Sequence, residues 1–250
     1  GWPKFAAHLW MRTADGGVAA TAYAPSSAHL TLSGIPVHIR CETGYPFSEE
    51  LRFSVECEAP VRFPLWLRIP NWAGLGSVVR IGDAAPIRAM PGTFQRIERT
   101  WSGRVELTLT LPMAVRITRR YHGAVAVERG PLVYSLKIGE EWRHLRGELP
   151  HADWEVHPTT PWNYGLVIDP ENPDVEVVKG KVGEVVYGPD HAPIHIKIKG
   201  RRIPEWTMEK NQAGPLPKSP VKSSEPIEEL TLIPYGCAKL RITEFPLVDS

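Results

Sequence analysis

The sequence has little cysteine, no excess of charge of either sign and no long apolar run. Its 250 residues contain 3 cysteines and have 29 Lys and Arg against 28 Asp and Glu, a formal net charge of +1. Binders of nucleic acid or membrane surfaces usually carry a basic excess, so neither partner is expected. No stretch approaches the roughly 20 apolar residues that span a bilayer. Residues 1–12 lack a signal peptide's apolar core. Either the chain is not exported or its true N-terminus is missing, so localisation stays open.

The cysteines and histidines indicate no metal site. Cys41, Cys57 and Cys237 are odd in number and far apart, which favours neither a disulfide framework nor a zinc site. Cys57 lies on the apolar side of an alternating segment, so we expect a buried structural thiol. The histidines form no HExxH motif. We therefore expect no metal ligands and no cofactor in this chain.

Helix signals are scarce and strand signals dominate. The 25 prolines, about twice the usual share, exclude a helical bundle. Residues 2–11 carry the nearest approach to a helical stripe, which is short and interrupted by Pro3. In residues 104–111, apolar side chains alternate with polar ones, as in a strand with one buried face. Residues 51–58, 65–69 and 194–199 repeat this pattern, and further strands are predicted at residues 18–23, 37–41, 94–101, 114–118, 132–138, 175–178, 229–233 and 240–243.

The spacing of strands and turns predicts the architecture. Turn signals such as residues 102–103 recur at the 8–12-residue spacing typical of sandwiches. The composition changes near residues 119–123, the chain becomes irregular after Ile138, and residues 209–229 are polar and rich in proline. We predict an all-β protein with two tandem antiparallel, jelly-roll-like β-sandwich domains. They would span residues 1–120, with an N-terminal segment, and residues 121–250.

No motif assigns catalytic residues to this chain. The sequence has no GxSxG, GxGxxG or Walker lysine loop. Glu49–Glu50 and Glu140–Glu141 are side-by-side acids in turn-like contexts, and solvated turn residues explain them. Asp153 and Glu155 flank Trp154 in an extended segment, where a paired-carboxylate site is the minor interpretation. A small hydrolase built from dispersed acids stays open as a third hypothesis.

Aromatic side chains supply the candidate site residues. An exposed tryptophan can stack on a sugar ring or pack against a neighbouring domain, and domain packing is the favoured reading. The candidates for a carbohydrate or domain interface are Trp2, Phe5, Trp10, Trp66, Trp72 and Trp101. The N-terminal members of this set resemble one half of an interface. We predict that Trp10 packs on residues 18–118 or lies between two copies of the chain.

Several segments, in order, carry a resemblance to a known family. They are residues 2–11 (WPKFAAHLWM), 43–47 (TGYPF), 67–73 (LRIPNWA), 99–101 (RTW), 111–113 (LPM), 127–134 (VERGPLVY), 232–236 (LIPYG) and 240–246 (LRITEFP). Together they resemble the C-terminal half of glycoside hydrolase family 127, the β-L-arabinofuranosidase-like enzymes formerly called DUF1680. The resemblance extends over essentially the whole chain.

The resemblance implies a catalytic (α/α)6 barrel followed by two β-sandwiches. In that family the barrel holds a zinc ion through a glutamate and three cysteines, with a cysteine nucleophile and a glutamate acid/base. This sequence has neither the cysteine doublet nor the barrel. No catalytic residue can be transferred to a position here, and the chain is not expected to be an enzyme on its own.

Two main hypotheses of function follow. The first is a non-catalytic accessory region that supports the barrel, in cis or in trans, with a homo-oligomer as a further possible assembly. The second is a stand-alone carbohydrate-binding module that uses exposed tryptophans. A groove of tryptophans with polar groups beside them would favour the second hypothesis.

Overall fold

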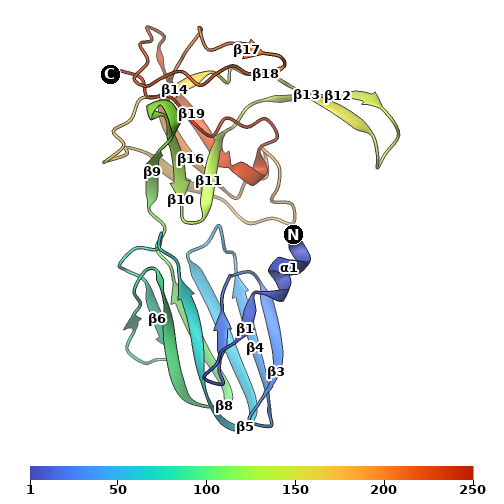
Figure 1. Cartoon of the computed structure of the whole chain (residues 1–250), viewed down its shortest axis with the longest axis vertical. Helices are drawn as coiled ribbons and strands as arrows, with labels where there is room; N and C mark the ends of the chain where they lie inside the picture. Colours follow the sequence, from blue (N-terminus) through green and yellow to red (C-terminus); the bar gives the residue numbers. More distant parts are fainter. Residues whose placement is uncertain (250) are drawn as a thin grey trace. The chain divides into compact units, whose positions relative to one another are not determined.

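The computed structural model describes residues 1–249, which divide into two all-β units, residues 1–114 and residues 115–249. The division lies six residues before the end of the domain predicted at 1–120. Residues of the predicted first domain cross into the second unit because Val115–Arg119 (β9) pairs antiparallel with Val125–Arg129 (β10). The expected all-β class is confirmed in both units (Figure 1).

Unit 1 is built on one eight-stranded sheet that curls over on itself. Its elements are α1 (Trp2–Ala7), β1 (Trp10–Arg12), β2 (Val18–Ala20), β3 (Ser26–Leu32), β4 (Ile35–Thr43), β5 (Glu50–Ile69), β6 (Val78–Ile81), β7 (Ile87–Arg88) and β8 (Thr93–Thr110). The path β1-β2-β5-β8-β6-β7 is extended by β3 and β4, which join through β5. All pairs are antiparallel except β2 with β5.

Two long strands, β5 and β8, run through both layers of the curled sheet. One half of the β5–β8 pair lies between β4 and β6, and the other half pairs with β2. Their pairing shifts register between Cys57 and Val61, which marks a bulge. Bulges bend strands and let one strand pass from one layer to the other. Opposite this bend, Gly103 has φ +61, a conformation that favours glycine. Residues 102–103, predicted as a turn, therefore lie inside one continuous strand.

The alternation read from the sequence matches the burial in unit 1. Leu107, Leu109 and Leu111 are at most 2% exposed, whereas Thr108 is half-buried and Glu106 is exposed. Side chains from both halves of β5 enter the same core cluster, so the curled sheet encloses one core.

Unit 2 has a seven-stranded sheet and two separate hairpins. Its elements are β9, η1 (Tyr121–Gly123), β10, β11 (Leu132–Leu136), β12 (Glu140–Arg146), β13 (Asp153–Pro158), β14 (Tyr164–Leu166), β15 (Glu176–Lys179), β16 (Ile194–Arg202), β17 (Met208–Glu209), β18 (Gln212–Ala213), β19 (Ile227–Pro234) and η2 (Tyr235–Cys237). The sheet order is β14-β16-β19-β11-β10-β9, with β15 added beside β16. Ile194, Ile196 and Ile198 of β16 are buried, as their alternation predicts.

Two local expectations for unit 2 are wrong. Residues 240–243 form no strand; the Leu136 N–H donates to the Ile242 carbonyl, but no ladder follows. The stretch after Ile138 is not irregular, because β12 and β13 form an antiparallel hairpin outside the main sheet (Figure 1).

Candidate functional site

The N-terminal segment of unit 1 presents an exposed aromatic pair. Trp2 is 74% exposed and Phe5 is 40% exposed, and their rings meet edge to face with centroids 5.9 Å apart. Pro3 lies in the first turn of α1, where a missing N–H costs nothing. The helix buries no residue, so both rings offer their surface to solvent.

The same segment then turns into the core at Leu9 and Trp10. Leu9 is 7% exposed, and the half-buried Trp10 packs edge-on against Phe53 with ring centroids 6.1 Å apart. The Trp10 indole N–H donates to the Ser26 hydroxyl over 3.1 Å. The expectation that Trp10 packs on residues 18–118 is thus confirmed, while residues 1–8 and Met11 remain exposed.

Trp66 lies on the polar face of β5, within a charged cluster. Its indole N–H donates to Asp15 Oδ2 over 3.3 Å, and the Arg96 guanidinium lies 5.5 Å from its ring centroid. Hydrogen bonds from Thr13, Trp66 and Arg96 lower the pKa of Asp15. Arg96 covers part of the indole face, so Trp66 is a half-buried member of an ion-paired network.

Trp72 and Trp101 are packed against other aromatic residues. Trp72 is half-buried and stacks on Tyr45 at 6.4 Å between ring centroids. Trp101 is 0% exposed; it stacks on Phe63 and donates its indole N–H to the Phe63 carbonyl over 3.0 Å. Including Trp101 among the interface candidates was wrong, because no part of its ring reaches the surface. The predicted residues therefore do not gather into one site.

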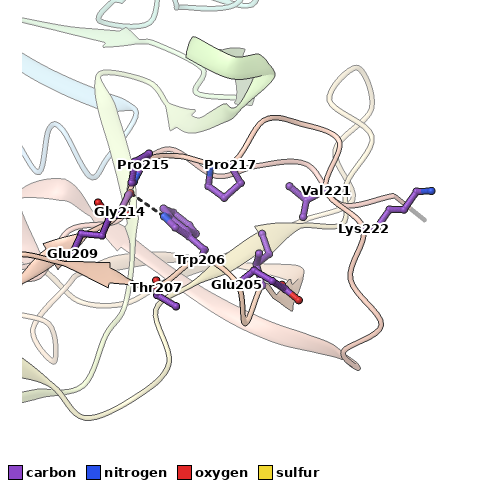
Figure 2. A pocket seen from close by; sticks show the side chains of 10 residues that line it. Glu205, Trp206, Thr207, Glu209, Gly214, Pro215, Pro217, Val221 and Lys222 are labelled. Atoms are coloured by element: carbon purple, nitrogen blue, oxygen red, sulfur yellow. Dashed lines mark hydrogen bonds between the residues drawn. The ribbon is translucent and has the colours of Figure 1, made fainter.

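Sequence reasoning missed the cavities of unit 2, two of which are lined by tryptophan. The first, of about 340 Å³, is lined by Trp206, Pro215, Pro217 and Val221 among others (Figure 2). Trp206 is 4% exposed and its indole N–H donates to the Gly214 carbonyl over 3.0 Å, as the dashed line in Figure 2 shows. Its ring is a packed part of the cavity wall and has little exposed surface on which a ligand could stack.

A second cavity, of about 580 Å³, lies beside the β12–β13 hairpin. It combines Trp162 with polar side chains that include His157, Asn211, Gln212 and Arg241. These residues come from distant parts of unit 2. The sequence signals close to the cavity were the proline-rich stretch at residues 209–229, the resemblance segment at 240–246, and Glu155 beside Trp154, but none of them indicated a cavity.

Several candidate acids are paired with a basic side chain, and the thiols of the described residues are buried. Glu141 pairs with Arg143, Asp153 with Arg146, and Glu155 with His157. All three cysteines are buried and unpaired, and the buried thiol expected at Cys57 is confirmed. Burial raises the pKa of Cys41 to about 12, which disfavours the nucleophilic thiolate. Within residues 1–249, no group of three or more His, Cys, Asp or Glu residues is placed to hold a metal ion.

The sequence of residues 17–113 matches a family model described as the β-L-arabinofuranosidase GH127 middle domain. Unit 1 is thus similar to the GH127 middle domain over most of its length. The resemblance to glycoside hydrolase family 127 is confirmed by this match. A search of curated proteins finds no match to the sequence.

Solved structures share the fold of the middle domain and of the region that follows it. A GH127 β-L-arabinofuranosidase from Geobacillus stearothermophilus T6 aligns over 97% of this chain, with 22% identity and a TM-score of 0.64. A GH127 β-arabinofuranosidase aligns over 94% with 19% identity and a TM-score of 0.63. A structure titled glycoside hydrolase aligns over 94% with 20% identity and a TM-score of 0.61. The chain spans 35%, 35% and 36% of these proteins, respectively. No helix among residues 1–249 is long and apolar enough to cross a membrane.

Proposed function

We propose that the chain is the non-catalytic β-sandwich region of a family 127-like glycoside hydrolase. It would support a catalytic (α/α)6 barrel, supplied in the same chain or as a separate subunit. The match of residues 17–113 to a middle domain carries this proposal. The chain corresponds to about a third of the length of an arabinofuranosidase of similar fold, which supports a role as part of a larger enzyme.

The Trp2–Phe5 pair is the surface that best suits contact with another domain. A helix of six residues is too short to be stable alone, yet it carries two exposed aromatic rings. Burying them against a partner would contribute several kcal/mol at about 25 cal/mol per Å². The barrel is the proposed partner, and a second copy of the chain could cover the same surface.

Activity of the purified chain tests the non-catalytic role. We expect no turnover of an aryl β-L-arabinofuranoside with added zinc, because the thiols of this chain are buried. Turnover above the blank that disappears when one of its cysteines is replaced by serine would contradict the proposal.

Sedimentation velocity tests the proposed surface. The Trp2→Ser, Phe5→Ser double variant should show weaker association than the unmodified chain, either with itself or with a family 127 barrel. Leu75→Ser is the matched control, since Leu75 is 78% exposed in the same unit. Equal association of the unmodified chain, the double variant and the control would show that the aromatic pair is not an interface.

A further inference from the structure

The larger cavity of unit 2 has the size of a small-ligand site. Its volume of about 580 Å³ falls within the roughly 300–1,000 Å³ of such sites. Its walls are the end of β13, the β17–β18 hairpin and residues 239–242, with Ile138 and Trp162. All of these segments belong to unit 2, so the cavity is complete within it.

One wall of this cavity is apolar and fixed in position. Ile138 is 5% exposed, and the half-buried Trp162 packs edge to face against Trp206 with ring centroids 5.2 Å apart. Trp206 is in turn held by its hydrogen bond to the Gly214 carbonyl. Packing against Trp206 therefore holds the Trp162 indole in place. A fixed indole gives the apolar face of a ligand a rigid surface to pack against.

The rim of the cavity offers paired and free polar groups. Glu155 Oε2 and His157 Nε2 lie 3.0 Å apart and satisfy each other in part. Asn211 and Gln212 are exposed at the rim, and within residues 1–249 their side-chain amides have no hydrogen-bond partner. An amide both donates and accepts, which suits a hydroxyl group.

Two cations in the lining of the cavity, Lys239 and Arg241, lack acidic partners. Lys239 and Arg241 form no ion pair with any carboxylate in the described part of the chain. The Arg241 Nε donates to the Ala238 carbonyl, and its guanidinium lies 4.4 Å from the Tyr235 ring centroid, which fixes the group without neutralising it.

Glu155 and Glu140, two carboxylates in or beside the cavity, have hydrogen-bond partners other than these cations. Glu155 pairs with His157. Glu140, which is not part of the lining, accepts the Lys239 backbone N–H over 3.2 Å and the Trp142 indole N–H over 3.1 Å. Since neither cation forms an ion pair in the described part of the chain, both are available to an anionic ligand group.

We propose that this cavity binds a short acidic saccharide. The C–H face of a sugar ring would lie against Trp162, and its hydroxyls would bond to Asn211, Gln212 and the Glu155–His157 pair. A uronate carboxylate would meet Lys239 and Arg241. Neutral polar groups beside a braced aromatic ring suit a sugar better than a bare phosphate, which has no apolar face. This site does not depend on the accessory role proposed above.

Titration calorimetry of the full chain with digalacturonate tests the site, with galactobiose as the neutral counterpart. We expect saturable binding of digalacturonate and at least about tenfold weaker binding of galactobiose, because a hydrogen bond to a charged group is worth more than a neutral one. Lys239→Gln and Arg241→Gln should each weaken digalacturonate binding by about tenfold and leave galactobiose binding unchanged. Asn211→Ala should weaken the binding of both sugars.

Lys222→Gln is the matched control, because Lys222 lines a different cavity of the same unit (Figure 2). It should leave binding unchanged, and thermal unfolding should confirm that every variant is folded. The proposal is overturned if digalacturonate does not bind, if galactobiose binds equally well, or if both charge variants bind as the unmodified chain does. Competition by inorganic phosphate at equal concentration would also overturn it, as a mere anion site.

Discussion

Replacing Leu109 by alanine should produce a large loss of stability confined to unit 1. Leu109 of β8 lies directly between Leu51 of β5 and Val79 of β6 in the sheet. All three side chains are 0% exposed. The backbone ladders on both sides hold the neighbouring strands at a fixed spacing, so the structure cannot collapse fully into the space left by the missing atoms.

The expected cost follows from that enclosure. Leucine-to-alanine changes in cores cost about 2–5 kcal/mol, and sites that relax least lie in the upper part of this range. Thr108→Ala is the matched control, because the neighbouring position lies between Arg52 and Arg80 on the polar face. Since Thr108 is half-buried and enters no core cluster, its replacement should cost about 0.5 kcal/mol or less.

Hydrogen exchange measured by mass spectrometry separates the two units in the intact chain. In Leu109→Ala, the amides of β5 and β8 that exchange only when unit 1 unfolds should exchange at least about 30-fold faster. Peptides from β16 and β19 of unit 2 serve as the internal reference and should not change. Similar acceleration in the Leu109 and Thr108 variants would refute the assignment of buried and polar faces.

Four further outcomes are expected. Burial raises the pKa of Tyr45 and of Tyr134 to about 12; above pH 10 the unfolded chain therefore loses phenolic protons that the folded chain keeps, and stability should fall between pH 10 and 12 in urea titrations. The Tyr134 hydroxyl is buried with no hydrogen-bond partner within residues 1–249, so Tyr134→Phe should keep full stability at pH 7 and show a smaller alkaline loss; a cost above about 1 kcal/mol at pH 7 would indicate a missed partner. Iodoacetamide should modify Cys41 at least about 100-fold more slowly in the folded chain than in urea, since the thiol is buried and its pKa is raised; mass spectrometry showing equal rates would contradict this. Trp101→Phe should lower the free energy of unfolding by about 2–4 kcal/mol in urea titrations, and a loss below about 0.5 kcal/mol would contradict its core position.

Period-two alternation was the strongest predictor of this fold. It located the buried faces of β5, β8 and β16, because each of these strands has one face in a core and one toward water. It could not show that β5 and β8 continue through a bend, since Pro60 and Gly103 also have the signature of turns. The β12–β13 hairpin left no such signal because both of its faces are largely exposed.

The candidate sites were harder to predict than the strands. Trp101 and Trp2 are the same type of residue, yet Trp101 is 0% exposed and Trp2 is 74% exposed. Burial depends on packing partners that lie far away in the chain, such as Phe63, whose ring stacks on Trp101. The larger cavity of unit 2 joins three segments in the same way, and no local pattern marks their meeting.

The passage of β5 and β8 through both layers of unit 1 bears on how this unit unfolds. When two sheets are joined only by loops, one sheet can separate and unfold while the other stays folded. Here each layer contains half of the same two strands, which pair from Glu50–Thr110 at one end to Ile69–Thr93 at the other. Loss of one layer would pull the ends of β5 and β8 out of the other, so the layers are mechanically coupled. Unit 1 should thus unfold in a single cooperative step, with little partial opening that would expose strand edges to proteases or to other chains.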